Sequence, residues 1–179
     1  MCIRDSAGPG RGTGPGLCAL GNPGQLNRSG TGVMKSESGT YILILRSEIS
    51  ASVEIGRWGL LQIDPGYYAY VGSAFGSGGL LARVSRHCGT AKKMHWHIDY
   101  LRQHTHLVSV WYSHSRSRFE HEWARLMSGY TNTRPVAGFG CSDCTCESHL
   151  FFSIKMPQAK EFGEKAGVGI KVWSCDTRG

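Results

Sequence analysis

Three cysteines and one histidine crowd into residues 141–149 of this 179-residue chain. They follow the pattern C-x₂-C-x-C-x₂-H, which offers the thiolate and imidazole ligands that Zn²⁺ binds in tetrahedral sites. Structural zinc sites usually take two pairs of ligands from separate segments, whereas these four residues are almost consecutive. We therefore favour packing and hydrogen bonding over zinc binding for this cluster, whose members are Cys141, Cys144, Cys146 and His149.

A second group of potential ligands surrounds Trp96, where a short helix is predicted over 96–103. Residues four apart lie on the same face of a helix, so His95 and Asp99 share a face that His97 does not. Coordination of one metal ion by all three side chains is therefore not expected. We interpret His95 and Asp99 as a pair that supports a functional site or contacts nucleic acid.

Two longer helices are predicted to carry further reactive side chains. Apolar residues recur at helical spacing over 80–88 and again over 119–128, and a glycine ends each segment. Arg83 and His87 lie one turn apart and so share a face of the first helix. Glu120 and Glu122 are two residues apart in the second helix and point in different directions, so only one of them can face a site.

The remaining pattern predicts strands that position these helices. Apolar and β-branched runs predict strands over 39–45, 52–56, 67–72 and 108–112. Early strands followed by helices, without strict β-α-β alternation, indicate an α+β domain built around a small sheet.

We expect this domain to cover 37–156. Residues 1–36 contain 9 Gly and 3 Pro and show no apolar period, and such a composition is typical of disorder. Residues 157–179 are also weakly patterned, and a flexible tail is expected there.

Four motifs occur in order along the expected domain: Gly39-Thr40-Tyr41, Tyr70-Val71-Gly72, Arg83 with His87, and the segment 119–124. In this order and at these intervals they resemble the GIY-YIG nuclease family. The segments 95–101 and 138–151 resemble the branch of that family that is sometimes appended to endonuclease III. The resemblance implies a small GIY-YIG-type domain with a central, mainly antiparallel sheet flanked by helices.

The resemblance also implies hydrolysis of DNA phosphodiester bonds with one Mg²⁺ or Mn²⁺ ion. Tyr41 and Tyr70 would place phenol oxygens near the attacking water, one of them as general base or base relay. Arg83 would bind the scissile phosphate through two parallel donors. Glu122 would hold the metal, and His87 would assist proton transfer or contact phosphate.

Glu120 is the alternative metal ligand; we choose Glu122 because Glu-Trp-Ala resembles the metal-binding helix of structure-specific family members. Many members also carry an Asn after a Pro that follows this helix, and here 136–140 contains none. Supporting roles are open for Ser142, Asp143 and His149. The missing Asn motivates the alternative of a catalytically impaired, GIY-YIG-fold nucleic-acid-binding module, and a zinc-binding interaction domain is a third hypothesis.

The formal charge of +7 favours a polyanionic partner. Residues 80–125 hold 8 basic and 3 acidic residues together with seven of the eight His. We expect DNA contacts from Gly72, Ser73, Arg86, Lys92, Lys93, His95 and His97.

Other classes are less compatible with the sequence. Apolar runs are too short for a membrane span, and no leader opens the chain, so a cytoplasmic protein is expected. The Gly-rich segment 76–79 lacks the Lys-Ser/Thr of a phosphate-binding loop, so no nucleotide cofactor is expected. The oligomeric state does not follow from these residues.

Overall fold

The computed structural model describes residues 33–89 and 96–174 and contains a six-stranded antiparallel sheet. The strand order is β6-β7-β4-β1-β5-β8. The strands are β1 (Gly39–Ser47), β4 (Gly66–Ala74), β5 (His106–His114), β6 (Thr133–Pro135), β7 (Leu150–Ser153) and β8 (Lys171–Ser174). A separate hairpin pairs β2 (Ala51–Ile55) with β3 (Gly59–Ile63) across the 3₁₀ turn η1 (Gly56–Trp58).

The apolar run of β1 occupies the middle of the sheet, between β4 and β5. Successive side chains of a strand point to opposite faces, and both faces of β1 are covered. Leu43 and Leu45 belong to one hydrophobic core, and Ile42 and Ile44 to another on the opposite face. Burial on both faces explains why this strand is continuously apolar rather than alternating.

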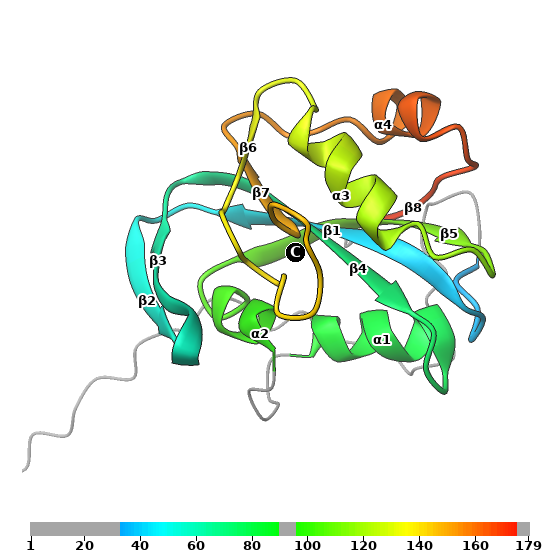
Figure 1. The fold of residues 1–179 in the computed structure, drawn as a ribbon, viewed down its shortest axis with the longest axis horizontal. Helices are drawn as coiled ribbons and strands as arrows, with labels where there is room; N and C mark the ends of the chain where they lie inside the picture. Colours follow the sequence, from blue (N-terminus) through cyan, green and yellow to red (C-terminus); the bar gives the residue numbers. More distant parts are fainter. Residues whose placement is uncertain (1–32, 90–95, 175–179) are drawn as a thin grey trace, which may run out of the picture.

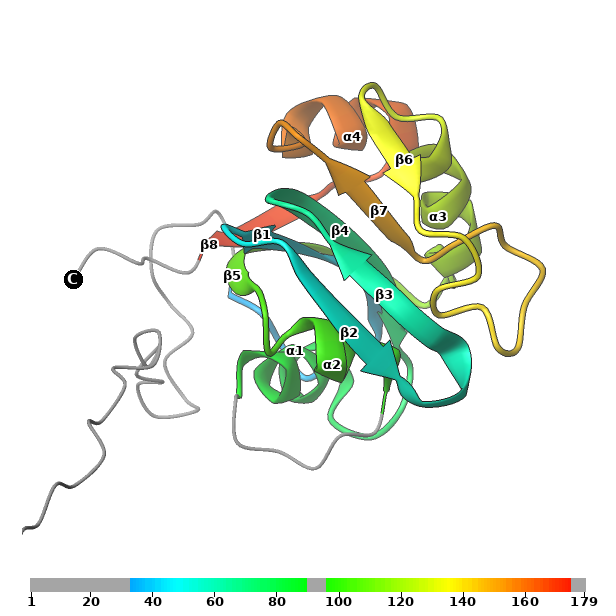
Figure 2. The same ribbon diagram turned by 90° about the vertical axis from the view of Figure 1, so that its left-hand side faces the viewer.

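Helices cover both faces of the sheet (Figures 1 and 2). On one face, the first core takes side chains from α1 (Gly79–Cys88), α2 (His97–Leu101) and the β2–β3 hairpin. On the other, the second core takes side chains from α3 (Glu120–Ser128) and α4 (Ala159–Ala166). The expected α+β class, with an antiparallel sheet flanked by helices, is confirmed.

The prediction of a flexible tail over 157–179 is wrong for the part that the structure describes. Helix α4 buries Phe162 completely, and β8 adds an edge strand to β5. The segment is held in place by the buried ring of Phe162 and by the pairing of β8, and neither feature produces a long periodic pattern in the sequence. At the other end, residues 1–32 lie outside the described part, whereas Met34 is buried in the first core.

Strand β3, which pairs with β2 in a hairpin, was not predicted from the sequence. Helix α2 is shorter than the helix expected over 96–103. Within the described ranges, no helix has the length and apolar character that a membrane crossing requires.

Candidate functional site

The site lies where one edge of β4 loses its neighbouring strand. Strand β7 pairs with β4 over Tyr67–Tyr70, and the backbone N–H of Val71 then donates to the carbonyl of His149 at 2.9 Å. Beyond that point, Gly72–Ala74 pair with β1 on the other side of β4. Side chains from both faces of the sheet approach this edge, where α1, α3 and the loop 136–149 come close to β4.

Tyr41 and Gly72 lie opposite each other in the β1–β4 ladder. A Cβ atom on Gly72 would lie 2.6 Å from the Tyr41 hydroxyl oxygen, so the absence of a side chain leaves room for the phenol ring. That hydroxyl lies 2.8 Å from Nε2 of His87 on α1. Gly72, expected to contact DNA, therefore has a packing role, and Tyr41 and His87 form a buried pair.

Both tyrosines of the site are neutral near pH 7. Burial raises the pKa of Tyr41 well above its usual value, and the nearby Tyr70 raises it further, while Arg83 opposes the shift. Burial also raises the pKa of Tyr70. The Glu120 carboxylate raises it further, and the positive charge of Arg83 lowers it. The phenols are therefore protonated rather than phenolate at neutral pH, and the charges of Arg83 and Glu120 both act on the pKa of Tyr70.

Two arginines of α1 stack on Trp96. The guanidinium carbons of Arg83 and Arg86 lie 4.5 and 4.4 Å from the centre of its rings. Arg86 also donates to buried Asp99 at 3.1 Å, which places Asp99 in a structural ion pair. Arg83, Arg86 and Trp96 line a pocket of about 210 Å³ beside Gly76–Gly79. Guanidinium groups beside a pocket are suited to binding a phosphate.

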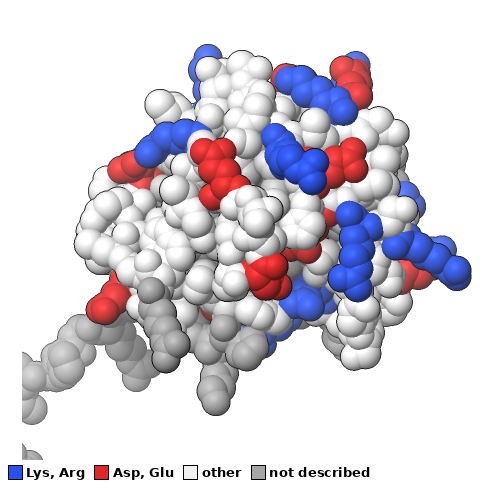
Figure 3. Space-filling model, viewed as in Figure 1, with Lys and Arg blue, Asp and Glu red and all other residues white. Residues whose placement is uncertain are grey.

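Basic and acidic side chains are interspersed on the face of the molecule that Figure 3 shows, so that face is not one continuous basic field. Attraction of a polyanion would thus depend on local groups such as Arg83 and Arg86 more than on the formal charge of +7.

Glu120, rather than Glu122, faces the site. Its Oε2 accepts a hydrogen bond from the Ser73 hydroxyl at 2.5 Å, and its Oε1 lies 3.5 Å from Nδ1 of His149. Glu122 is exposed. The geometry thus favours Glu120, the alternative metal ligand, over Glu122, because the first residue of α3 points toward β4 and the third points away. Ser73, expected to contact DNA, holds this carboxylate.

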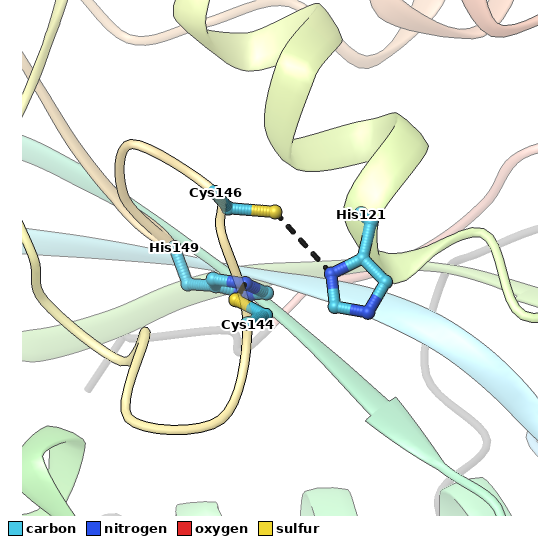
Figure 4. A group of neighbouring side chains, drawn as sticks. All are labelled: His121, Cys144, Cys146 and His149. Atoms are coloured by element: carbon cyan, nitrogen blue, oxygen red, sulfur yellow. Dashed lines mark hydrogen bonds between the residues drawn. The ribbon is translucent and has the colours of Figure 1, made fainter.

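Four side chains near Glu120 form a group that could hold a metal ion: His121, Cys144, Cys146 and His149. One ligand atom from each lies within 4.8 Å of all the others. His121 Nδ1 is 3.3 Å from Cys146 Sγ, and Cys144 Sγ is 3.2 Å from His149 Nε2. Figure 4 shows them converging, with His121 on α3 and the other three on the loop that leads to β7. We refer to these four residues as the His/Cys cluster.

Membership of the His/Cys cluster corrects the sequence-based ligand set. Cys141 is outside it and has its thiol 3.5 Å from the Phe139 carbonyl oxygen. Burial raises the pKa of Cys141 to about 12, and the neighbouring Cys144 adds to the shift. His121 takes its place. The four residues that could hold a metal ion therefore come from two segments, α3 and the loop before β7.

The remaining residues predicted to contact DNA or to support the site do not gather in one place. His97 packs edge-on against Phe139, at 5.8 Å between ring centres. Ser142 and Asp143 are exposed, and Asp143 acts only weakly on the pKa of Tyr70. Lys92, Lys93 and His95 lie outside the described residues.

One sequence signal could have identified His121. It lies between Glu120 and Glu122 on the predicted helix, and a zinc site with ligands from separate segments needs a donor outside 141–149. No sequence pattern indicates that Ser73 would hold Glu120, because that contact joins residues 47 positions apart.

Residues 40–170 match the model of a family described as domain of unknown function DUF123. No curated protein and no solved structure matches the chain.

The family match overturns the resemblance to GIY-YIG nucleases, since the matched family is a distinct domain. The glycines that carried the resemblance have packing reasons of their own. A Cβ on Gly39 would clash with the Ser113 carbonyl oxygen and Leu80, and Gly72 makes room for Tyr41. Short glycine and tyrosine motifs in paired strands therefore do not identify that family.

Proposed function

We propose, for a chain that belongs to the family described as domain of unknown function DUF123, that it hydrolyses DNA phosphodiester bonds with the help of a divalent cation. One observation carries the proposal: at the open edge of β4, Ser73 holds the Glu120 carboxylate at 2.5 Å, and the charges of Glu120 and of Arg83 on α1 both influence the pKa of Tyr70. A carboxylate, a guanidinium and a neutral hydroxyl are the kinds of group that phosphoryl transfer needs.

Each group has a role that its chemistry suits. Arg83, half-buried on α1, would bind the non-bridging phosphate oxygens through its fork of N–H donors. Tyr70 is the more exposed of the two phenols and would meet the attacking water. Tyr41 and His87 lie behind it, and their 2.8 Å contact offers a relay for the proton that the water loses.

The two candidate metal sites suit different ions. The Glu120 carboxylate is a hard ligand of the kind that Mg²⁺ or Mn²⁺ takes, usually with water completing the coordination. When bound there, such an ion would stabilise the leaving oxygen as a Lewis acid. The thiol and imidazole donors of the His/Cys cluster suit Zn²⁺ instead.

A second candidate function is nucleic-acid binding without cleavage. Its support is that both oxygens of Glu120 already have neighbours, Ser73 at 2.5 Å and His149 at 3.5 Å. A carboxylate held in this way has less freedom to take a catalytic ion, whereas the pocket beside Trp96 would still bind phosphate.

A cleavage assay distinguishes the two functions. Supercoiled, nicked and branched DNA would be incubated with the full chain and Mg²⁺ or Mn²⁺, alongside Glu120→Gln and the matched control Glu122→Gln. We expect cleavage by the wild type and Glu122→Gln, and at least a 100-fold loss for Glu120→Gln, typical for removal of a catalytic charge.

Binding would be measured in the same samples as a function of salt, because phosphate contacts weaken as salt rises. Salt-sensitive binding with no cleavage of any DNA shape would reject hydrolysis in favour of the binding module. Equal cleavage by the two glutamine variants would show that Glu120 is not the catalytic carboxylate.

A further inference from the structure

The His/Cys cluster joins two parts of the chain that are distant in sequence. His121 is the second residue of α3, and the other three members lie within 144–149. The cluster is about the size of a tetrahedral zinc site: zinc bonds of about 2.3 Å to sulfur and about 2.0 Å to nitrogen place the ligand atoms roughly 3.3–3.8 Å apart. Of the observed sulfur–nitrogen separations, 3.3 Å lies at the short end of that range and 3.2 Å just below it.

Four protein ligands leave no open position for water or substrate, and this is the composition of a structural zinc site rather than a catalytic one. Two sulfur and two nitrogen donors also discriminate against Mg²⁺ and Ca²⁺, which prefer oxygen. An ion in this position would fix the loop 136–149 to the first turn of α3.

His149 connects the cluster to the Glu120 carboxylate. Its Nε2 faces Cys144, while its Nδ1 lies 3.5 Å from Glu120 Oε1 and 3.3 Å from the Val71 carbonyl oxygen. The ring of His149 is almost fully buried, so packing fixes the directions in which Nε2 and Nδ1 point. If Nε2 binds a metal ion, the proton of the neutral ring must be on Nδ1, where it can be donated to these two oxygens.

We infer that the His/Cys cluster binds one structural Zn²⁺ ion. The bound ion would fix the position of Glu120 through His149, which contacts the carboxylate, and through His121, the next residue on α3. His149 is then a positioning residue that acts through the carboxylate, and Glu120 is the outer partner of a carboxylate–histidine–zinc arrangement. The zinc site stands without the proposed function; only its effect on DNA cleavage rests on it.

The first experiment measures zinc directly. The purified full chain would be analysed for metal, then stripped and reloaded with Co²⁺, whose visible spectrum reports thiolate ligands and tetrahedral geometry. We expect one zinc per chain and a tetrahedral cobalt spectrum. Cys146→Ser should lose both, whereas the matched control Cys141→Ser, in the same loop but outside the cluster, should keep both. Absence of zinc and of a thiolate–cobalt spectrum in the wild type would overturn the site.

The second experiment tests the link to Glu120 by zinc affinity instead of activity. Loss of the carboxylate partner of a zinc-bound histidine typically weakens metal affinity about 10- to 100-fold. Glu120→Gln should show that loss in a competition titration with a chelator, and Glu122→Gln should match the wild type. Equal affinities for both variants would overturn the link. Tight zinc binding and the expected link, with no cleavage of DNA by the wild type, would leave this inference standing and reject the proposed function.

Discussion

The hydroxyl of Tyr41 lies 2.8 Å from Nε2 of His87, and both side chains are almost completely buried, at 2% and 1% exposed. The contact fastens α1 to the central strand of the sheet at the site. A structural role of this pair and the proposed role in proton transfer can be separated experimentally.

Replacement of Tyr41 by Phe removes the hydrogen bond and keeps the ring. Because the contact is buried, we expect Tyr41→Phe to lower the free energy of unfolding by about 1–3 kcal/mol in urea titrations. Tyr67→Phe, at a half-buried position of β4, is the control and should change it by less than about 0.5 kcal/mol. If the pair relays a proton, cleavage by Tyr41→Phe should fall under conditions where the variant is fully folded.

Alkaline pH should destabilise the protein through its buried tyrosines. Burial raises the pKa of Tyr41 and of Tyr70 in the folded state, whereas unfolded tyrosines titrate near about 10. The unfolded chain therefore loses protons first, and stability is fully present below pH about 10 and falls above it. Each such tyrosine contributes a slope of about 1.4 kcal/mol per pH unit.

Urea titrations between pH 8 and 11 would measure this slope for the wild type and for Tyr41→Phe and Tyr70→Phe. Each variant should lose stability less steeply with pH than the wild type. Identical slopes for all three proteins would mean that neither phenol is kept protonated by the fold.

Gly72 should not tolerate a side chain. In Gly72→Ala the new Cβ would lie 2.6 Å from the Tyr41 hydroxyl oxygen, which can move only by breaking its contact with His87. We expect a loss of about 1–3 kcal/mol, visible as a drop in Tm of several degrees. Gly76→Ala meets open space and is the control. A wild-type Tm for Gly72→Ala would contradict the close approach.

Arg83 should contribute to nucleic-acid affinity through one phosphate. Arg83→Ala is expected to weaken DNA binding and to reduce the slope of log K against log salt by about 1. Arg134→Ala is the matched control, since that arginine is exposed and paired with Asp64 at 2.7 Å. Fluorescence anisotropy at several salt concentrations provides both quantities. An unchanged salt slope would remove Arg83 from the phosphate-binding groups.

The sequence predicts well those features that depend on neighbouring residues. Apolar period and glycine ends locate α1 and α3 to within one residue, and continuous hydrophobicity locates β1. The helical period also shows that only one of Glu120 and Glu122 can face the site. Which one does so depends on Ser73 and His149, which are distant in the chain and adjacent only after β4 and α3 pack together.

Ligand sets are harder to predict for the same reason. A local pattern names Cys144, Cys146 and His149, but the fourth member of the His/Cys cluster comes from α3. Cys141 fits the spacing equally well, but its thiol lies 3.5 Å from the Phe139 carbonyl oxygen and is not part of the group. Tertiary packing sets the direction of the backbone within a loop, so that direction cannot be predicted from residue spacing alone.

The C-terminal segment should be indispensable, contrary to its weak pattern. Phe162 is fully buried, with its ring centre 5.8 Å from that of Trp111 and 5.5 Å from that of Trp123. Phe162→Ala would leave a cavity between the sheet and α3 and should cost about 3–5 kcal/mol in urea unfolding. Lys160→Ala, on the exposed side of α4, should cost less than about 0.5 kcal/mol. Equal stability of these two variants would mean that α4 adds little to the second core, and that a domain ending near residue 156 would fold as well as the full chain.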